Sequence, residues 1–225
     1  MNAICDQIYC IHFLPYKNRL EPLKQEFERC NIKVKFVYTN DLGKDPVHQA
    51  AEGHLQCIND AIGNGYKKII IMEDDIRFLK DLEKLNEYCK NIPENADIVL
   101  FDYIITNQNK AKEKMSKMKD KNDYYFPIGT ETFWNASCYL LSDKAMNHIL
   151  INQQKKILPP DHYTTYRSFS VDKSTDIKYK RYCPIECLCI QKVFDNNLRK
   201  KVHGFDNSYA RYTKQGTDIR NYNIN

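Results

Sequence analysis

The sequence predicts an α/β protein with an open, twisted, mainly parallel sheet of Rossmann-like type that is flanked by helices. Short runs of β-forming apolar residues alternate with stretches of helical apolar spacing at least three times in residues 1–102. The strand candidates are apolar almost throughout, as strands covered on both faces are. A chain of 225 residues with 42% hydrophobic and 28% charged residues suits one folded domain with a substantial interior.

The elements follow in order along the chain. Apolar β-formers predict four strands, and apolar residues three or four apart predict the helices between them. Residues 108–123 are charged and lack this spacing, so we expect a loop or a solvated helix there. A strand in 135–142 and a short amphipathic helix in 143–151 resume the pattern. The first four strands are expected at 8–13, 33–38, 67–72 and 96–102, and the helices between them at 19–30, 47–62 and 79–89.

Charge and cysteine content restrict the class of protein. The 34 basic and 29 acidic residues give a net charge of +5, which is below the dense basic surface of a dedicated nucleic-acid binder but suits a phosphate-bearing substrate. The nine cysteines are odd in number and spread through core segments, which predicts reduced thiols. No signal peptide and no transmembrane run of ~20 apolar residues is evident. We expect a soluble cytoplasmic protein, free or peripheral to a membrane, and in the host cytoplasm if the protein is viral.

Three acids, Glu73, Asp74 and Asp75, directly follow the apolar run of the third strand. Ligands of open α/β sheets bind outside the carboxyl ends of the strands. Adjacent carboxylates repel one another unless a cation is present, and hard oxygen ligands favour Mg²⁺ or Mn²⁺ completed by substrate phosphates. The pattern therefore predicts a divalent metal site for a diphosphate substrate. The alternative is that the acids open a helix and complement its dipole.

Four segments together resemble the glycosyltransferases of family 25, the lipooligosaccharide and collagen galactosyltransferase group. Within them, His12 and Phe13 stand where the family usually has Asn and Leu, and Gly53 stands where it has Ser. The resemblance implies a GT-A fold with an acidic site for a metal and a nucleotide sugar. The segments are IHFLPYKNRLEPL, EGHLQCINDAIGNGYKKIIIMEDD, NASCYLLSDKAMNHIL, and LPPDH with CPIECLCIQ.

The resemblance implies roles for the acids. Asp75 would bind the metal directly, while Glu73 and Asp74 would reach the ribose, sugar hydroxyls or metal-bound water, with Glu73 also a candidate ligand. His203 in the C-terminal segment is a further candidate metal ligand. The implied cofactor is Mn²⁺ or Mg²⁺, and the donor is a UDP-sugar. His54 lies on the apolar stripe of a predicted helix, so we expect it to be structural or to support a ligand.

Transfer of a sugar with inversion needs a base within reach of the acceptor hydroxyl. Asp161 matches the aspartate of the family and follows Pro159 and Pro160, which stiffen the approach. Its alternative is an ordinary Pro-Asp turn. Asp102, at the end of the fourth strand, is the second candidate base, with a strand-end turn as its alternative.

Further residues are expected to contact the donor. Arg19 or a lysine of residues 110–121 could pair with its phosphates, although a solvated face is the alternative for that basic run. The expected donor-binding residues are His12, Phe13, Arg19, Thr39, Asn40 and Asp41, the last three near the nucleotide base, together with Glu73 and Asp74.

The sequence therefore predicts one GT-A domain over residues 1–225, with a nucleotide-sugar-binding half in 1–105, an acceptor-side half in 124–198 and a polar tail in 199–225. We expect it to transfer a hexose, galactose or glucose, from a UDP-sugar to a glycan, glycoprotein or glycolipid acceptor. Two alternatives remain: an inactive glycan-binding or structural module of the same fold, and a Mg-dependent nucleotidyltransferase. The second should carry a Gly-rich phosphate loop near the N-terminus, and none is present.

Overall fold

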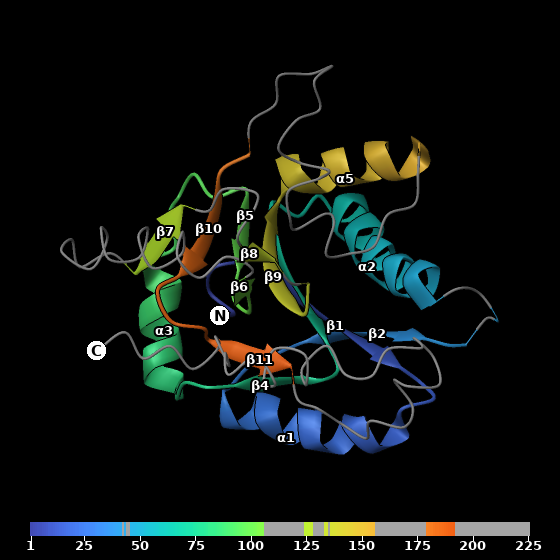
Figure 1. Cartoon of the computed structure of the whole chain (residues 1–225), viewed down its shortest axis with the longest axis horizontal. Helices are drawn as coiled ribbons and strands as arrows, with labels where there is room; N and C mark the ends of the chain where they lie inside the picture. Colours follow the sequence, from blue (N-terminus) through green and yellow to red (C-terminus); the bar gives the residue numbers. More distant parts are fainter. Residues whose placement is uncertain are drawn as a thin grey trace.

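A central seven-stranded sheet organises the chain (Figure 1). The computed structural model describes residues 1–41, 43, 46–105, 124–127, 133–134, 136–155 and 179–191. The charged segment 108–123 and the tail 199–225 lie outside these residues. In spatial order the strands are β2 (Lys35–Thr39), β1 (Gln7–Phe13), β3 (Lys68–Glu73), β9 (Cys138–Ser142), β5 (Ile98–Leu100), β10 (Arg181–Pro184) and β7 (Tyr125–Pro127).

Five of the seven strands run in the same direction. β1 is parallel to β2 and β3, and β10 is parallel to β5. β9 is antiparallel to both β3 and β5, and β7 is antiparallel to β10. The prediction of a mainly parallel Rossmann-like sheet is confirmed, with β9 inserted in reverse at its centre.

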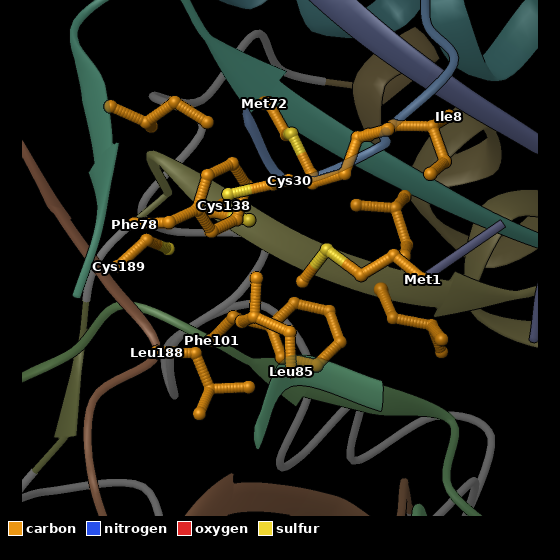
Figure 2. Packing of buried hydrophobic residues seen from close by; sticks show 14 of the residues in the cluster. Met1, Ile8, Cys30, Met72, Phe78, Leu85, Phe101, Cys138, Leu188 and Cys189 are labelled. Atoms are coloured by element: carbon orange, nitrogen blue, oxygen red, sulfur yellow. The ribbon is translucent and has the colours of Figure 1, made fainter. Parts of the chain in front are cut away.

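Helices cover both faces of the sheet. Alternate residues of each buried strand point to opposite faces, and the residues on both faces are apolar. Ile69 and Ile71 of β3 pack with α2 (Pro46–Gly63) and α5 (Asp143–Lys155). Ile70 and Met72 pack on the other face with α1 (Leu20–Arg29) and α3 (Leu82–Lys90). Figure 2 shows part of this second layer, where Met72 lies near Cys138. A strand buried on both faces thus delivers the acids that follow it.

Short strands complete the fold. β4 (Ile76–Phe78) pairs antiparallel with β11 (Cys189–Gln191), and β6 (Ile104–Ile105) pairs with β8 (Phe133–Trp134). The predicted helix at 79–89 begins only at Leu82, where the Asp81 side chain accepts a hydrogen bond from Lys84 N at 2.8 Å. The interpretation that the three acids open a helix is therefore wrong, because a turn and β4 separate them from α3.

All nine cysteines are free, and eight of them are buried. In the parts of the chain that the structure describes, no helix has the length and apolar character needed to cross a membrane.

Candidate functional site

Polar residues gather at one edge of the central sheet. The carboxyl ends of β1, β2, β3 and β5 lie at this edge, and β9 begins there because it runs in the opposite direction. Ligands of open α/β sheets bind outside such an edge. The residues placed at or just beyond these strand ends are Phe13, Thr39, Glu73, Asp102 and Ser137.

Asp74 is the centre of a buried ion cluster. Its Oδ1 accepts a hydrogen bond from Arg19 Nη1 at 2.6 Å. Its Oδ2 accepts from His12 Nδ1 at 2.8 Å and from Phe13 N at 3.0 Å. All three side chains of the cluster are buried, and the Arg19 guanidinium also lies 4.0 Å above the Tyr16 ring. Charge-assisted bonds of this kind are strong, so Asp74 joins the end of β1 and the short 3-10 helix η1 (Lys17–Arg19) to the turn after β3.

Asp75 lies beside the same cation. Its Oδ2 is 3.5 Å from Arg19 Nη1, and the side chain is buried. The guanidinium therefore sits between two adjacent carboxylates and offsets their mutual repulsion. Arg19, which the sequence analysis assigned to the donor phosphates, is directed at these two acids.

Glu73 is the most exposed of the three acids. Its side chain is 28% exposed, compared with 5% for Asp74 and for Asp75. As the last residue of β3, it donates its backbone N–H to Ser137 O at 2.8 Å. Its Oε1 lies 3.3 Å from Nε2 of the buried His54. Glu73 is thus the acid of this group best placed to meet a ligand from solvent.

His54 reaches Glu73 from α2. Its Nδ1 lies 2.6 Å from the Tyr139 hydroxyl of β9, and the two rings are stacked at 5.7 Å with an interplanar angle of 12°. The preceding Gly53 allows this close approach of α2 to the sheet, because a Cβ there would lie 3.0 Å from Ile11 Cγ2. The histidine is a satisfied buried residue whose outer nitrogen points at the site.

Asp102 and Ser137 form a second buried pair at the same edge. Ser137 Oγ donates to Asp102 Oδ2 at 2.5 Å, and both residues are 0% exposed. Asp102 would therefore have to be uncovered before it could meet an acceptor hydroxyl. The sequence analysis missed Ser137, which shows there only as a small polar residue before an apolar run.

The turn after β2 carries the residues expected near the nucleotide base. Asn40 Oδ1 accepts from Asp41 N at 2.9 Å, and Asp41 Oδ1 accepts from Gly43 N at 2.9 Å. The hydrogen bond from Gly43 lowers the pKa of Asp41, with a smaller effect from Gln49. Asn40 and Asp41 are exposed and Thr39 is half-buried. The other expected site residues, Asp161, His203 and the lysines of 110–121, lie outside the described residues.

The acids at the end of β3 suit a divalent cation in kind. Glu73 and Asp75 supply hard oxygen donors, and Mg²⁺ is commonly held by one or two carboxylates while substrate phosphates and waters complete its shell. Within the described ranges, no group of three or more His, Cys, Asp or Glu side chains is arranged to hold a metal ion. A metal at this edge would therefore need ligands besides the described side chains.

Comparisons with known proteins bear on the family and the fold of the chain. The sequence model of glycosyltransferase family 25, described as an LPS biosynthesis protein, matches residues 50–164, just over half of the chain. A crystal structure described as a glycosyltransferase involved in the glycosylation of the major capsid of PBCV-1 aligns with a TM-score of 0.51. The two are 9% identical over 88% of this chain and 100% of that chain, which shows a shared fold. A mannose-1-phosphate geranyltransferase from Thermus thermophilus gives a TM-score of 0.40 at 11% identity over 79% of this chain and 73% of that chain. No curated protein matches the sequence.

Proposed function

This chain belongs to glycosyltransferase family 25, and on that basis we propose that it transfers a hexose from a UDP-sugar to an acceptor hydroxyl. The proposed sugar is galactose or glucose, and the proposed acceptor is a glycan, glycoprotein or glycolipid. The observation that carries the proposal is the position of Glu73, Asp74 and Asp75 at the carboxyl end of β3, in the interior of the sheet. A cation bound to a diphosphate is commonly held by one or two carboxylates, and Glu73 is partly exposed close to the buried Asp75.

The three acids have different proposed roles in binding the metal and the donor. Asp75 and Glu73 would hold Mn²⁺ or Mg²⁺, which supplies Lewis-acid neutralisation of the leaving diphosphate when it is bound. Asp74 has both carboxylate oxygens occupied by Arg19, His12 and Phe13 N. We therefore give Asp74 a positioning role, in place of direct contact with ribose or sugar hydroxyls.

Asp161 remains the proposed base. It follows two prolines and matches the family aspartate, and it would remove the proton of the acceptor hydroxyl as the new bond to the sugar forms with inversion. Asp102 is less suited to this role because it is fully buried and accepts a hydrogen bond from Ser137.

Release of UDP from a panel of UDP-sugars tests the proposal. We expect release from UDP-galactose or UDP-glucose in the presence of acceptor, loss of release with EDTA and recovery with Mn²⁺. Asp161→Asn should reduce turnover by at least ~10²-fold, the low end of the contribution of a positioned base. Asp75→Ala should reduce it by a similar factor, because it removes a ligand of the metal that neutralises the leaving diphosphate. The matched control is Asp143→Asn, since Asp143 forms an exposed pair with Lys67 at the opposite edge of the sheet.

One result would count against the proposed activity, and another against the proposed metal ligand. If the protein binds a glycan but releases no UDP from any UDP-sugar, the chain is a binding module of this fold. If Asp75→Ala keeps wild-type turnover, the metal is held elsewhere.

A further inference from the structure

A buried tyrosine and a buried histidine lie behind Glu73, the most exposed acid of the site. We infer that Tyr139 and His54 form a hydrogen-bonded relay that positions the Glu73 carboxylate toward the cation and the donor sugar. This inference rests on the proposed function, and it adds two positioning residues from β9 and α2 to the site.

The direction of the hydrogen bonds follows from the acceptor. An ionised carboxylate only accepts, so the 3.3 Å contact with Glu73 Oε1 requires a hydrogen on His54 Nε2. In the neutral ring, Nδ1 then carries the lone pair and accepts from the Tyr139 hydroxyl at 2.6 Å. Both contacts are made by a single neutral tautomer. The tyrosine hydroxyl thus selects the form of the histidine that can donate to Glu73.

Packing holds the relay in place. Tyr139 is 0% exposed and pairs in register with Ile71 of β3 and Leu100 of β5, so it lies in the interior of the sheet. His54 is stacked on the Tyr139 ring, and the lack of a side chain at Gly53 lets α2 lie close to Ile11 of β1. Close-packed interiors leave a buried ring little room to move. The imidazole therefore presents its N–H to Glu73 from a fixed position.

Glu73 needs such support more than its neighbours do. Asp74 is fixed by three hydrogen bonds, and Asp75 is buried beside Arg19. Glu73 has the longest side chain of the three and is the most exposed, so ordering it on a ligand costs the most side-chain entropy. A partner that orders it beforehand lowers this cost when the cation binds. Groups that orient metal ligands typically change metal affinity by about 10- to 100-fold when they are removed.

Calorimetry of UDP binding in the presence of Mn²⁺ tests the relay on the full chain. We expect His54→Leu to weaken UDP binding about 10- to 100-fold. Tyr139→Phe keeps the ring but removes the hydroxyl, so it should weaken binding less, near the low end of this range at about 10-fold. His54→Gln places an amide N–H near the position of Nε2 and should recover most of the affinity. Recovery by glutamine is not expected if the histidine only fills space.

A double-mutant cycle with Glu73→Ala shows whether the effect passes through Glu73. If it does, adding His54→Leu to Glu73→Ala changes UDP affinity little further. The inference would be overturned if the loss of UDP affinity in the double variant equalled the sum of the losses in His54→Leu and Glu73→Ala. Wild-type affinity in both His54→Leu and Tyr139→Phe would also overturn it.

The chain offers a control in another histidine–tyrosine pair, whose histidine is buried and whose tyrosine is half-buried. His148 of α5 is buried and hydrogen-bonded through Nδ1 to the Tyr179 hydroxyl, and both lie near the opposite edge of the sheet. His148→Leu and Tyr179→Phe should leave UDP affinity unchanged. Should His54→Leu fail to fold, Tyr139→Phe decides the inference alone, with its melting curve as the check of folding.

The same data separate this inference from the proposed function. A wild-type protein that neither binds UDP with Mn²⁺ nor releases it from a UDP-sugar overturns the proposed function and the relay with it. A wild-type protein that does both, while the relay variants bind UDP as tightly, overturns the relay alone.

Discussion

Replacing Asp74 by asparagine tests whether the buried ion cluster holds the candidate site together. The change keeps the size of the side chain but removes the charge that faces Arg19 Nη1 at 2.6 Å and His12 Nδ1 at 2.8 Å. The side chains of Asp74 and Arg19 are 5% and 10% exposed, so water screens the pair weakly. Breaking a buried ion pair costs about 3–5 kcal/mol. Because Arg19 keeps its contact with Asp75 at 3.5 Å, we expect the low end of this range, about 3 kcal/mol.

Thermal unfolding of the ligand-free protein measures this loss. In a chain of this length, 1 kcal/mol lowers the melting temperature by about 2–4 °C, so Asp74→Asn should melt about 6–12 °C below the wild type. The matched control is again Asp143→Asn, which removes an exposed carboxylate 3.0 Å from Lys67 Nζ. Exposed pairs contribute up to about 1 kcal/mol, so this variant should melt within about 4 °C of the wild type.

An Asp74→Asn protein that melts with the control would refute the structural role of the cluster. If that protein also gained no stability from UDP and Mn²⁺, Asp74 would be a direct ligand contact. On our reasoning the variant is instead destabilised without ligand, and saturating UDP and Mn²⁺ still raise its melting temperature.

Two further predictions concern the packing and charge of the fold. Gly53→Ala should destabilise the protein by about 1 kcal/mol in urea unfolding, because crowding of Ile11 Cγ2 at 3.0 Å outweighs the higher helix propensity of alanine; a higher urea midpoint would contradict this. The pKa of Asp60 is lowered by hydrogen bonds from Lys35 and from the Tyr9 hydroxyl. Its contribution to stability is therefore full above the unfolded pKa of about 3.9 and is lost as the pH falls through the lower folded value. As the pH falls below about 4, the urea midpoint of Asp60→Asn should therefore decrease less than that of the wild type. Parallel plots of urea midpoint against pH for the two proteins would contradict the assignment.

The main elements of the fold could be predicted from the sequence because their signals are local. The residues before Glu73 form an apolar run as long as a typical strand. The apolar residues of α2 recur at helical spacing along the helix. β4 and β11 could not be predicted, because each has three residues and they are joined only by pairing Ile76–Phe78 with Cys189–Gln191. The antiparallel direction of β9 could not be predicted either, because an apolar run has the same pattern in a parallel and in an antiparallel strand.

The place of the candidate site could be predicted, but the division of roles within it could not. The strand-end rule located the three acids without knowledge of their surroundings. Which acid is buried depends on Arg19, 55 residues away, and on the backbone N–H of Phe13. Ser137 joins Glu73 to Asp102 through one backbone and one side-chain hydrogen bond. Such contacts arise only when the ends of separate strands meet.

Anomalous diffraction from crystals grown with Mn²⁺ and UDP tests the proposed metal site most directly. Our account predicts a manganese peak within about 2.5 Å of carboxylate oxygens of Asp75 or Glu73, with the UDP phosphates on its far side. A manganese peak elsewhere on the protein, with Asp75 still beside Arg19 and Glu73 still beside His54, would contradict it.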